Sequence, residues 1–113
     1  MKIAFTTKGT HWQSMIDPRF GRTEYIGLYD EETDLLEFID NRLTTGENHG
    51  AGTKTSKLLF DLNPDVLISG NGPGSNAVEV LNRMDLDIYT GAGEMTVKDA
   101  YKAYKNNTLN KTE

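Results

Sequence analysis

Glycine-rich segments at strand-to-helix junctions constrain this chain more than any other feature. Seven of the eleven glycines lie in three of them: His49-Gly50-Ala51-Gly52, Gly70 to Asn76 and Gly91-Ala92-Gly93-Glu94. Glycine at such a junction lets backbone N–H groups approach a ligand at the positive end of a helix dipole. Two interpretations are open: a site for an anion built mainly from backbone, or three tight turns without a ligand.

The hydrophobic pattern predicts an α/β fold in which a β-hairpin precedes alternating helices and strands. The predicted strands are residues 2–7, 23–30, 35–41, 65–69 and 86–90. The short polar turn at 31–34 fits a hairpin. Apolar residues at helical spacing predict three helices, carried by Ala51, Thr55, Leu58, Leu59 and Leu62, by Ala77, Val80, Leu81 and Met84, and by Val97, Ala100, Tyr101 and Tyr104.

This order of elements predicts a single domain over residues 1–105 with a mixed five-stranded sheet. Right-handed crossovers make the later strands parallel, which gives the order 3-2-1-4-5 with strand 2 antiparallel and helices on both faces. Residues 106–113 are polar and are expected to form a frayed tail. Ligands of open α/β sheets bind beyond the carboxyl ends of the strands, where the strand order reverses. We therefore expect the 8–22 loop and the three glycine-rich segments to line one shared surface.

Composition narrows the classes of function. The formal net charge of -5 argues against a nucleic-acid partner, which needs a basic face. There is no apolar run long enough for a membrane span, and the N-terminus turns polar too early for a signal peptide, so a cytoplasmic protein is expected. The chain has no cysteine, so a bound metal must use His, Asp or Glu, or bring its own ligands.

Catalysis is not expected. A two-metal nuclease needs clustered carboxylates with one on a central strand, whereas the first predicted strand has none and Asp65 stands at the wrong end of the fourth. The sequence also shows no nucleophile–base pair at diagnostic spacing. The sequence therefore predicts a binding protein rather than an enzyme.

Four segments together carry a resemblance to a known family: Asp17 to Arg22 (DPRFGR), His49 to Gly52, Ser69 to Gly74 (SGNGPG) and Gly91 to Glu94. In their order and spacing the chain resembles the dinitrogenase iron–molybdenum cofactor biosynthesis family, small domains such as NifX and the C-terminal part of NifB. The resemblance covers roughly residues 1–105. It implies a ribonuclease H-like fold, a connection with nitrogen fixation and the carriage of an iron–sulfur or iron–molybdenum cofactor precursor. A metallocluster donor or acceptor protein would then be the partner.

His49 is the predicted metal ligand, because its imidazole could cap an exposed iron of a preformed cluster. The alternative is a hydrogen bond to loop carbonyls. Arg19 is expected to hold the charge of an anionic ligand, whereas Phe20 beside it is expected in the core. The predicted cofactor-binding residues are Arg19, Gly50, Gly52, Gly70, Asn71, Gly72 and Gly93. A module that binds a small anionic metabolite or a protein partner remains the alternative function.

Overall fold

The computed structural model of the 113-residue chain describes residues 1–42, 51–71, 81 and 83–112. Its strands are β1 (Lys2–Thr7), β2 (Tyr25–Asp30), β3 (Leu35–Asp40), β4 (Val66–Ile68), β5 (Asp87–Thr90) and β6 (Asn110–Thr112), and its helices are α1 (Ala51–Leu62) and α3 (Val97–Lys105). Most of the predicted second helix lies outside the described residues, as do His49, Gly50 and Gly72.

The strands form one mixed sheet in the order β3-β2-β1-β4-β5-β6. β2 is antiparallel to β1 and β3, whereas β1, β4 and β5 are parallel to one another. The predicted order 3-2-1-4-5 and the antiparallel second strand are thus confirmed for the first five strands. The predicted count of five is wrong, because β6 pairs antiparallel with β5 and makes six.

The frayed tail predicted for 106–113 is also wrong at Asn110–Thr112, which form β6. Asn107 has a φ of 59°, in the left-handed region that Asn tolerates, just after the end of α3. Leu109 packs against the core, and Tyr89 then pairs with Lys111 across the ladder. An edge strand needs no apolar side chains of its own to form this ladder, so its polar sequence gave no strand signal.

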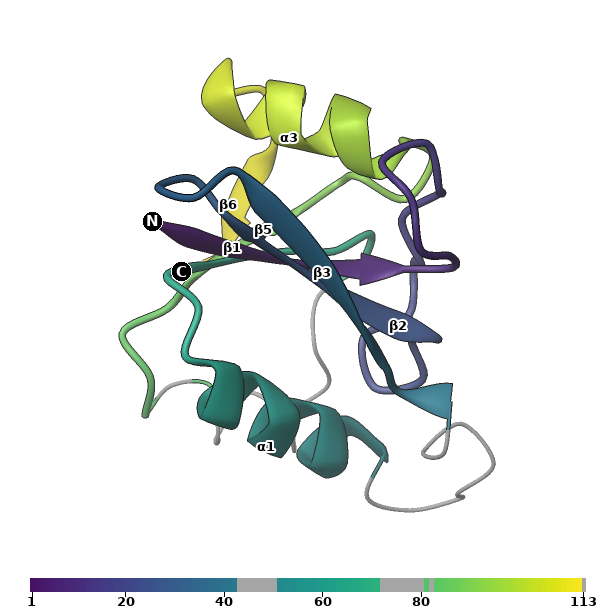
Figure 1. The fold of residues 1–113 in the computed structure, drawn as a ribbon, viewed down its shortest axis with the longest axis vertical. Coiled ribbons are helices and arrows are strands. Elements are labelled where there is room, and N and C mark those ends of the chain that lie inside the picture. Colours follow the sequence, from purple (N-terminus) through teal and green to yellow (C-terminus); the bar gives the residue numbers. More distant parts are fainter. Residues whose placement is uncertain (43–50, 72–80, 82, 113) are drawn as a thin grey trace.

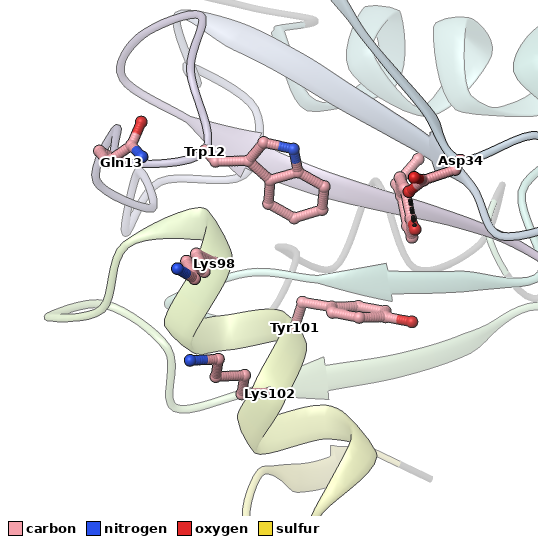
Figure 2. Close-up of a pocket in the computed structure, with 7 residues that line it drawn as sticks. Trp12, Gln13, Asp34, Lys98, Tyr101 and Lys102 are labelled. Carbon is pink, nitrogen blue, oxygen red and sulfur yellow. Dashed lines mark hydrogen bonds between the residues drawn. The ribbon is translucent and has the colours of Figure 1, made fainter.

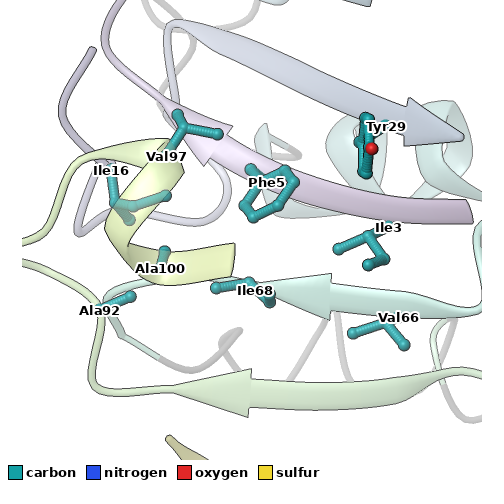
Figure 3. Close-up of a cluster of buried hydrophobic side chains, with 9 residues drawn as sticks. All are labelled: Ile3, Phe5, Ile16, Tyr29, Val66, Ile68, Ala92, Val97 and Ala100. Atoms are coloured by element: carbon teal, nitrogen blue, oxygen red, sulfur yellow. The ribbon is translucent and has the colours of Figure 1, made fainter. Parts of the chain in front are cut away.

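The two described helices cover opposite faces of the sheet (Figure 1), which confirms that part of the prediction. Alternation along β1 supplies both faces: Ile3 and Phe5 pack with Val97 of α3, whereas Ala4 packs with Leu59 of α1. Figure 3 shows the core on the α3 side, where the fully buried Phe5 lies among residues from β1, β4 and α3. The central strands are therefore buried on both sides.

The ends of the helices follow from local sequence. α1 ends at Leu62, and Asn63 then takes a φ of 51° before Pro64. α3 begins after Thr96, whose Oγ1 accepts a hydrogen bond from the Asp99 backbone N–H at 3.1 Å. In the part of the chain that the structure describes, neither helix could cross a membrane.

Candidate functional site

Three loops meet beyond the carboxyl ends of β1, β4 and β5. The Asn71 N–H donates to the Pro18 carbonyl at 3.0 Å, and the Gly91 N–H donates to the Gly70 carbonyl at 3.1 Å. A Cβ on Gly70 would stand 2.6 Å from the Cα of Pro18 and 2.9 Å from the Cα of Gly93, so only glycine fits between these two loops. The expected meeting of the 8–22, 70–76 and 91–94 segments is borne out for Pro18, Gly70, Asn71, Gly91 and Gly93, whereas the shared surface as a whole stays a prediction. Residues 49, 50 and 72–76 lie outside the described residues.

Asp17 organises the loop that follows β1. Its side chain is fully buried and accepts four hydrogen bonds. Oδ1 accepts from the backbone N–H and Nε of Arg19, both at 3.0 Å, while Oδ2 accepts from an Nη of Arg19 at 3.0 Å and from the Glu24 N–H at 3.2 Å. The Asp17 carbonyl accepts from the buried Thr6 hydroxyl at 2.8 Å. The loop conformation is thus held by one carboxylate at the end of the central strand.

Arg19 is held by this carboxylate on one side and open to solvent on the other. Its side chain is 51% exposed although it pairs with the fully buried Asp17. Hydrogen bonding to Asp17 raises the pKa of Arg19 above its usual value, and Coulomb attraction to Asp17 and Glu24 acts in the same direction against desolvation. The guanidinium therefore stays charged, its orientation is set by a fork-shaped pair with Asp17, and its solvent-exposed side remains available to a ligand.

Backbone donors at this junction divide into two groups. The N–H groups of Asn71 and Gly91 already donate to protein carbonyls. Within the described residues, the N–H groups of Gly70 and Gly93 have no protein acceptor. These two glycines lie against each other: a Cβ added to Gly93 would stand 3.6 Å from the Cα of Gly70. Unpaired backbone N–H groups in two neighbouring loops are available to an anion.

The N-terminus of α3 does not add to these donors. The Val97 N–H donates to the Ser14 carbonyl and the Lys98 N–H to the Trp12 carbonyl, both at 2.9 Å, while Thr96 takes the Asp99 N–H. The expectation that the helix after Gly91–Glu94 offers free N–H groups at its start is therefore wrong, although the Gly93 N–H itself has no acceptor among the described residues. The 8–22 loop folds back, and its carbonyls accept hydrogen bonds from the first N–H groups of α3. No local sequence pattern around Gly91 could reveal this pairing.

The start of α1 is tied to the same region by a buried threonine. Thr55 Oγ1 donates to the Gly21 carbonyl at 2.8 Å and accepts from Asn41 Nδ2 at 3.0 Å. Gly52 lies in the first turn of this helix, where N–H groups have no intrahelical partner. Phe20 is 4% exposed and packs in the core on the α1 side, as predicted. The helix that follows His49 is thereby anchored against the loop that carries Arg19.

Metal-ligating side chains do not gather in the described part of the chain. No group of three or more His, Asp and Glu residues there could hold a metal ion. His11 is exposed, and its backbone N–H donates to Ser14 Oγ at 3.1 Å.

Asp17, Thr6 and Ser69 are the residues at this site that sequence reasoning did not single out. The available signal for Asp17 was its place two residues before Arg19. Thr6 and Ser69 had no such signal, because their buried contact, 3.0 Å between hydroxyl oxygens, joins residues distant in sequence.

The fold defines a small mixed α/β domain with a candidate site where three loops meet beyond the carboxyl ends of the parallel strands. A family model described as dinitrogenase iron-molybdenum cofactor matches residues 1–107, and the chain belongs to this family. No curated protein sequence matches the chain.

Solved structures agree with this assignment. The apo form of the orange protein from Desulfovibrio gigas is 26% identical with a TM-score of 0.91, and the match covers 98% of this chain and 92% of that one. A Thermotoga protein assigned as NifB is 31% identical with a TM-score of 0.81, over 96% of this chain and 90% of that one. A Methanocaldococcus jannaschii protein assigned as a dinitrogenase is 17% identical with a TM-score of 0.68, over 100% and 95% of the two chains, and shows the shared fold alone.

Proposed function

We propose that this protein binds and carries an anionic metallocluster, an iron–sulfur or iron–molybdenum cofactor precursor, and that it does so without catalysing a reaction. The observation that carries the proposal is the junction of three loops, where the half-exposed Arg19 guanidinium lies in the same loop as Pro18, against which Gly70 and Gly93 pack. A guanidinium of fixed orientation and unpaired N–H donors in neighbouring loops are suited to a preformed anion. Membership of the dinitrogenase iron-molybdenum cofactor family supports this class of ligand.

His49 is the proposed side-chain ligand to the cluster, with the amides of Gly50, Gly52, Gly70 and Gly72, together with Asn71 and Gly93, completing the site. The chain has no cysteine, so it cannot surround a bare cluster with thiolates. It should instead accept an assembled cluster from a donor protein and pass it to an acceptor. Binding should weaken as the pH falls through the ordinary histidine range, about 6.5, because a protonated imidazole cannot ligate a metal.

The test is an anaerobic titration with isolated iron–molybdenum cofactor, followed by visible absorption and metal analysis of the gel-filtered complex. We expect Arg19→Ala to weaken binding about tenfold or more, because a charge-assisted contact is lost. Arg19→Lys keeps the positive charge but loses the fork-shaped pair, so its affinity for the cofactor should lie between those of the parent and Arg19→Ala. His49→Ala should remove the pH dependence as well as affinity.

Arg42→Ala is the matched control, because Arg42 forms the same type of pair with Asp40 and is 57% exposed. It should bind as the parent does. Equal affinity in the parent and His49→Ala would remove His49 from the site, and equal loss in Arg19→Ala and Arg42→Ala would reduce the effect to net charge. No binding by the parent would refute the carrier proposal and favour a small anionic metabolite or a protein partner.

A further inference from the structure

A second concave site lies on the α3 side of the sheet, between the 8–16 segment and α3. It is a cavity of about 380 Å³ lined by Trp12, Gln13, Tyr29, Asp34, Lys98, Tyr101 and Lys102 (Figure 2). This volume falls in the range of small-molecule pockets. Trp12 and Gln13 belong to the same 8–22 loop, but the lining contains none of the residues Pro18, Arg19, Gly70 and Gly93 on which the carrier proposal depends, so that proposal leaves the pocket unexplained.

Three aromatic rings form the apolar wall of this pocket. The centroids of Trp12 and Tyr29 are 5.0 Å apart at 72°, and those of Tyr29 and Tyr101 are 5.2 Å apart at 76°. Rings in edge-to-face contact at these distances leave no space between them for a ligand. They are therefore not a cage around a methylated ammonium group, and a ligand can only lie against their outer faces. An aromatic ligand can stack on the outer face of one of these rings and meet the edge of another.

The charged residues of the pocket favour an anion. Lys98 and Lys102 stand one helical turn apart on α3, and neither has an ion-pair partner among the described residues. The third lysine of this helix, Lys105, pairs instead with Glu31 at 2.8 Å. The single carboxylate of the lining, Asp34, accepts a hydrogen bond from the Tyr29 hydroxyl at 2.6 Å. In Figure 2 the two lysines lie at one end of the pocket and Asp34 at the other.

Hydrogen bonds within the protein hold the walls of the pocket in place. The Lys98 N–H donates to the Trp12 carbonyl at 2.9 Å, which fixes the 8–16 segment to the helix. The Tyr101 hydroxyl donates to Glu31 Oε2 at 2.5 Å, which fixes that ring to the turn after β2. A ligand would therefore meet walls that need little further ordering, which favours binding.

We propose that this pocket binds a small planar aromatic compound that carries a phosphate or carboxylate group. The ring lies against Trp12 and Tyr101, the anionic group faces Lys98 and Lys102, and a ring N–H or amino group donates to Asp34. This is a site separate from the loop junction, and it requires no metallocluster.

Trp12 is the sole tryptophan of the chain, so its fluorescence reports on the pocket directly. We would titrate the metal-free protein with adenosine monophosphate and with anthranilate, which present a phosphate and a carboxylate on an aromatic ring. Excitation at the red edge of the indole band avoids absorption by adenine, and calorimetry replaces fluorescence for anthranilate. At least one of the two should bind saturably and at least tenfold more tightly than its parts: adenosine, aniline, inorganic phosphate or acetate.

Variants locate the site. The double variant Lys98→Ala/Lys102→Ala should weaken binding about tenfold or more, because two charge-assisted contacts are lost. Lys57→Ala, an exposed lysine on α1 across the sheet, is the control and should bind as the parent does. Both sets of changes are on the surface, and folding is checked by thermal melting.

Four results would overturn the proposal. Neither probe binds; inorganic phosphate binds as tightly as adenosine monophosphate; phenyltrimethylammonium binds more tightly than either anion; or Lys57→Ala weakens binding as much as the double variant. None of these results bears on cluster binding at the loop junction, so the two proposals fail independently.

Discussion

Two Asp-x-Arg segments of this chain have the same hydrogen bonding in different surroundings. In both, the aspartate Oδ1 accepts from the backbone N–H and Nε of the arginine two residues on, and Oδ2 accepts from an Nη, at distances between 2.8 and 3.1 Å. The arginine side chains are similarly exposed, 51% for Arg19 and 57% for Arg42. The carboxylates differ: the Asp17 side chain is fully buried, whereas that of Asp40 is 50% exposed.

This difference teaches that the local motif does not define the site. Among the described residues, the Asp40 carboxylate accepts hydrogen bonds from Arg42 alone, and this half-exposed pair lies at the end of β3. The Asp17 side chain also accepts a hydrogen bond from the Glu24 N–H, and the Asp17 carbonyl accepts one from the Thr6 hydroxyl. Asp17 therefore links the loop after β1 to the central strand. The same three-residue pattern is therefore a surface ion pair in one place and the support of a candidate binding loop in the other.

The largest difference should appear on removal of the carboxylates. Asp17→Ala leaves two partly buried N–H donors and the Arg19 guanidinium without their acceptor and removes a fully buried side chain, and we expect a loss of about 2–4 kcal/mol in the free energy of unfolding. That corresponds to a fall of roughly 8–15 °C in melting temperature for a domain of this size. Asp40→Ala is the matched change, and its melting temperature should lie close to that of the parent. Equal losses in the two variants would show that burial of the carboxylate is not what distinguishes these pairs.

The packing around Pro18 should give the next largest effect. Gly70→Ala places a Cβ at 2.6 Å from the Cα of Pro18, a backbone atom that cannot move without shifting the loop that Asp17 supports. We expect a loss of about 1–3 kcal/mol, measured by urea unfolding, because the atom is forced into a filled space. Gly93→Ala is the control, since its Cβ would meet atoms at 3.6 and 3.8 Å, an ordinary contact distance. A stable Gly70→Ala protein with parent-like affinity for the cofactor would show that the loops need not pack this closely.

The order of the first five strands could be predicted because each step has a local signal. The polar turn between β2 and β3 indicates a hairpin, and the helical spacing of Leu58, Leu59 and Leu62 indicates a crossover. The right-handedness of crossover connections and the burial of the apolar strands then leave one order for these five strands. β6 had no such signal, because its pairing depends on the reversal at Asn107 and on Leu109 reaching the core, and both are tertiary effects.

For the candidate site, the sequence could predict which loops meet. Strand direction alone places Pro18, Gly70 and Gly93 at one edge of the sheet. The roles inside the junction were not predictable, since a buried Asp17 and a solvated Asp40 look alike in sequence. The donors at the start of α3 were misjudged for a related reason: the carbonyls that occupy them, of Trp12 and Ser14, lie more than eighty residues earlier in the chain.

The smallest expected effect is the pH dependence of the exposed pair, and it has a defined window. Hydrogen bonding to the Arg42 side chain, reinforced by the Arg42 backbone N–H, lowers the pKa of Asp40 from its ordinary 3.8 to about 2. A group whose pKa is depressed by folding stabilises the folded state above its unfolded pKa, and that contribution is lost as the pH falls through the folded value. The pair should therefore contribute a constant amount from neutral pH down to about 5 and lose it between about 4 and 2.

Asp40→Asn isolates this contribution, because the amide mimics the protonated acid in shape. The difference in urea midpoint between the parent and Asp40→Asn should be small, steady above about pH 5, and should close toward zero as the pH approaches 2. A carboxyl NMR titration of the folded parent gives the Asp40 pKa directly. A midpoint difference that vanishes near pH 5, or an Asp40 resonance that titrates at the ordinary value, would show that the fork to Arg42 does not persist in solution. In that case the two segments would differ because the Asp40–Arg42 pair does not form in solution, and not because Asp17 is buried.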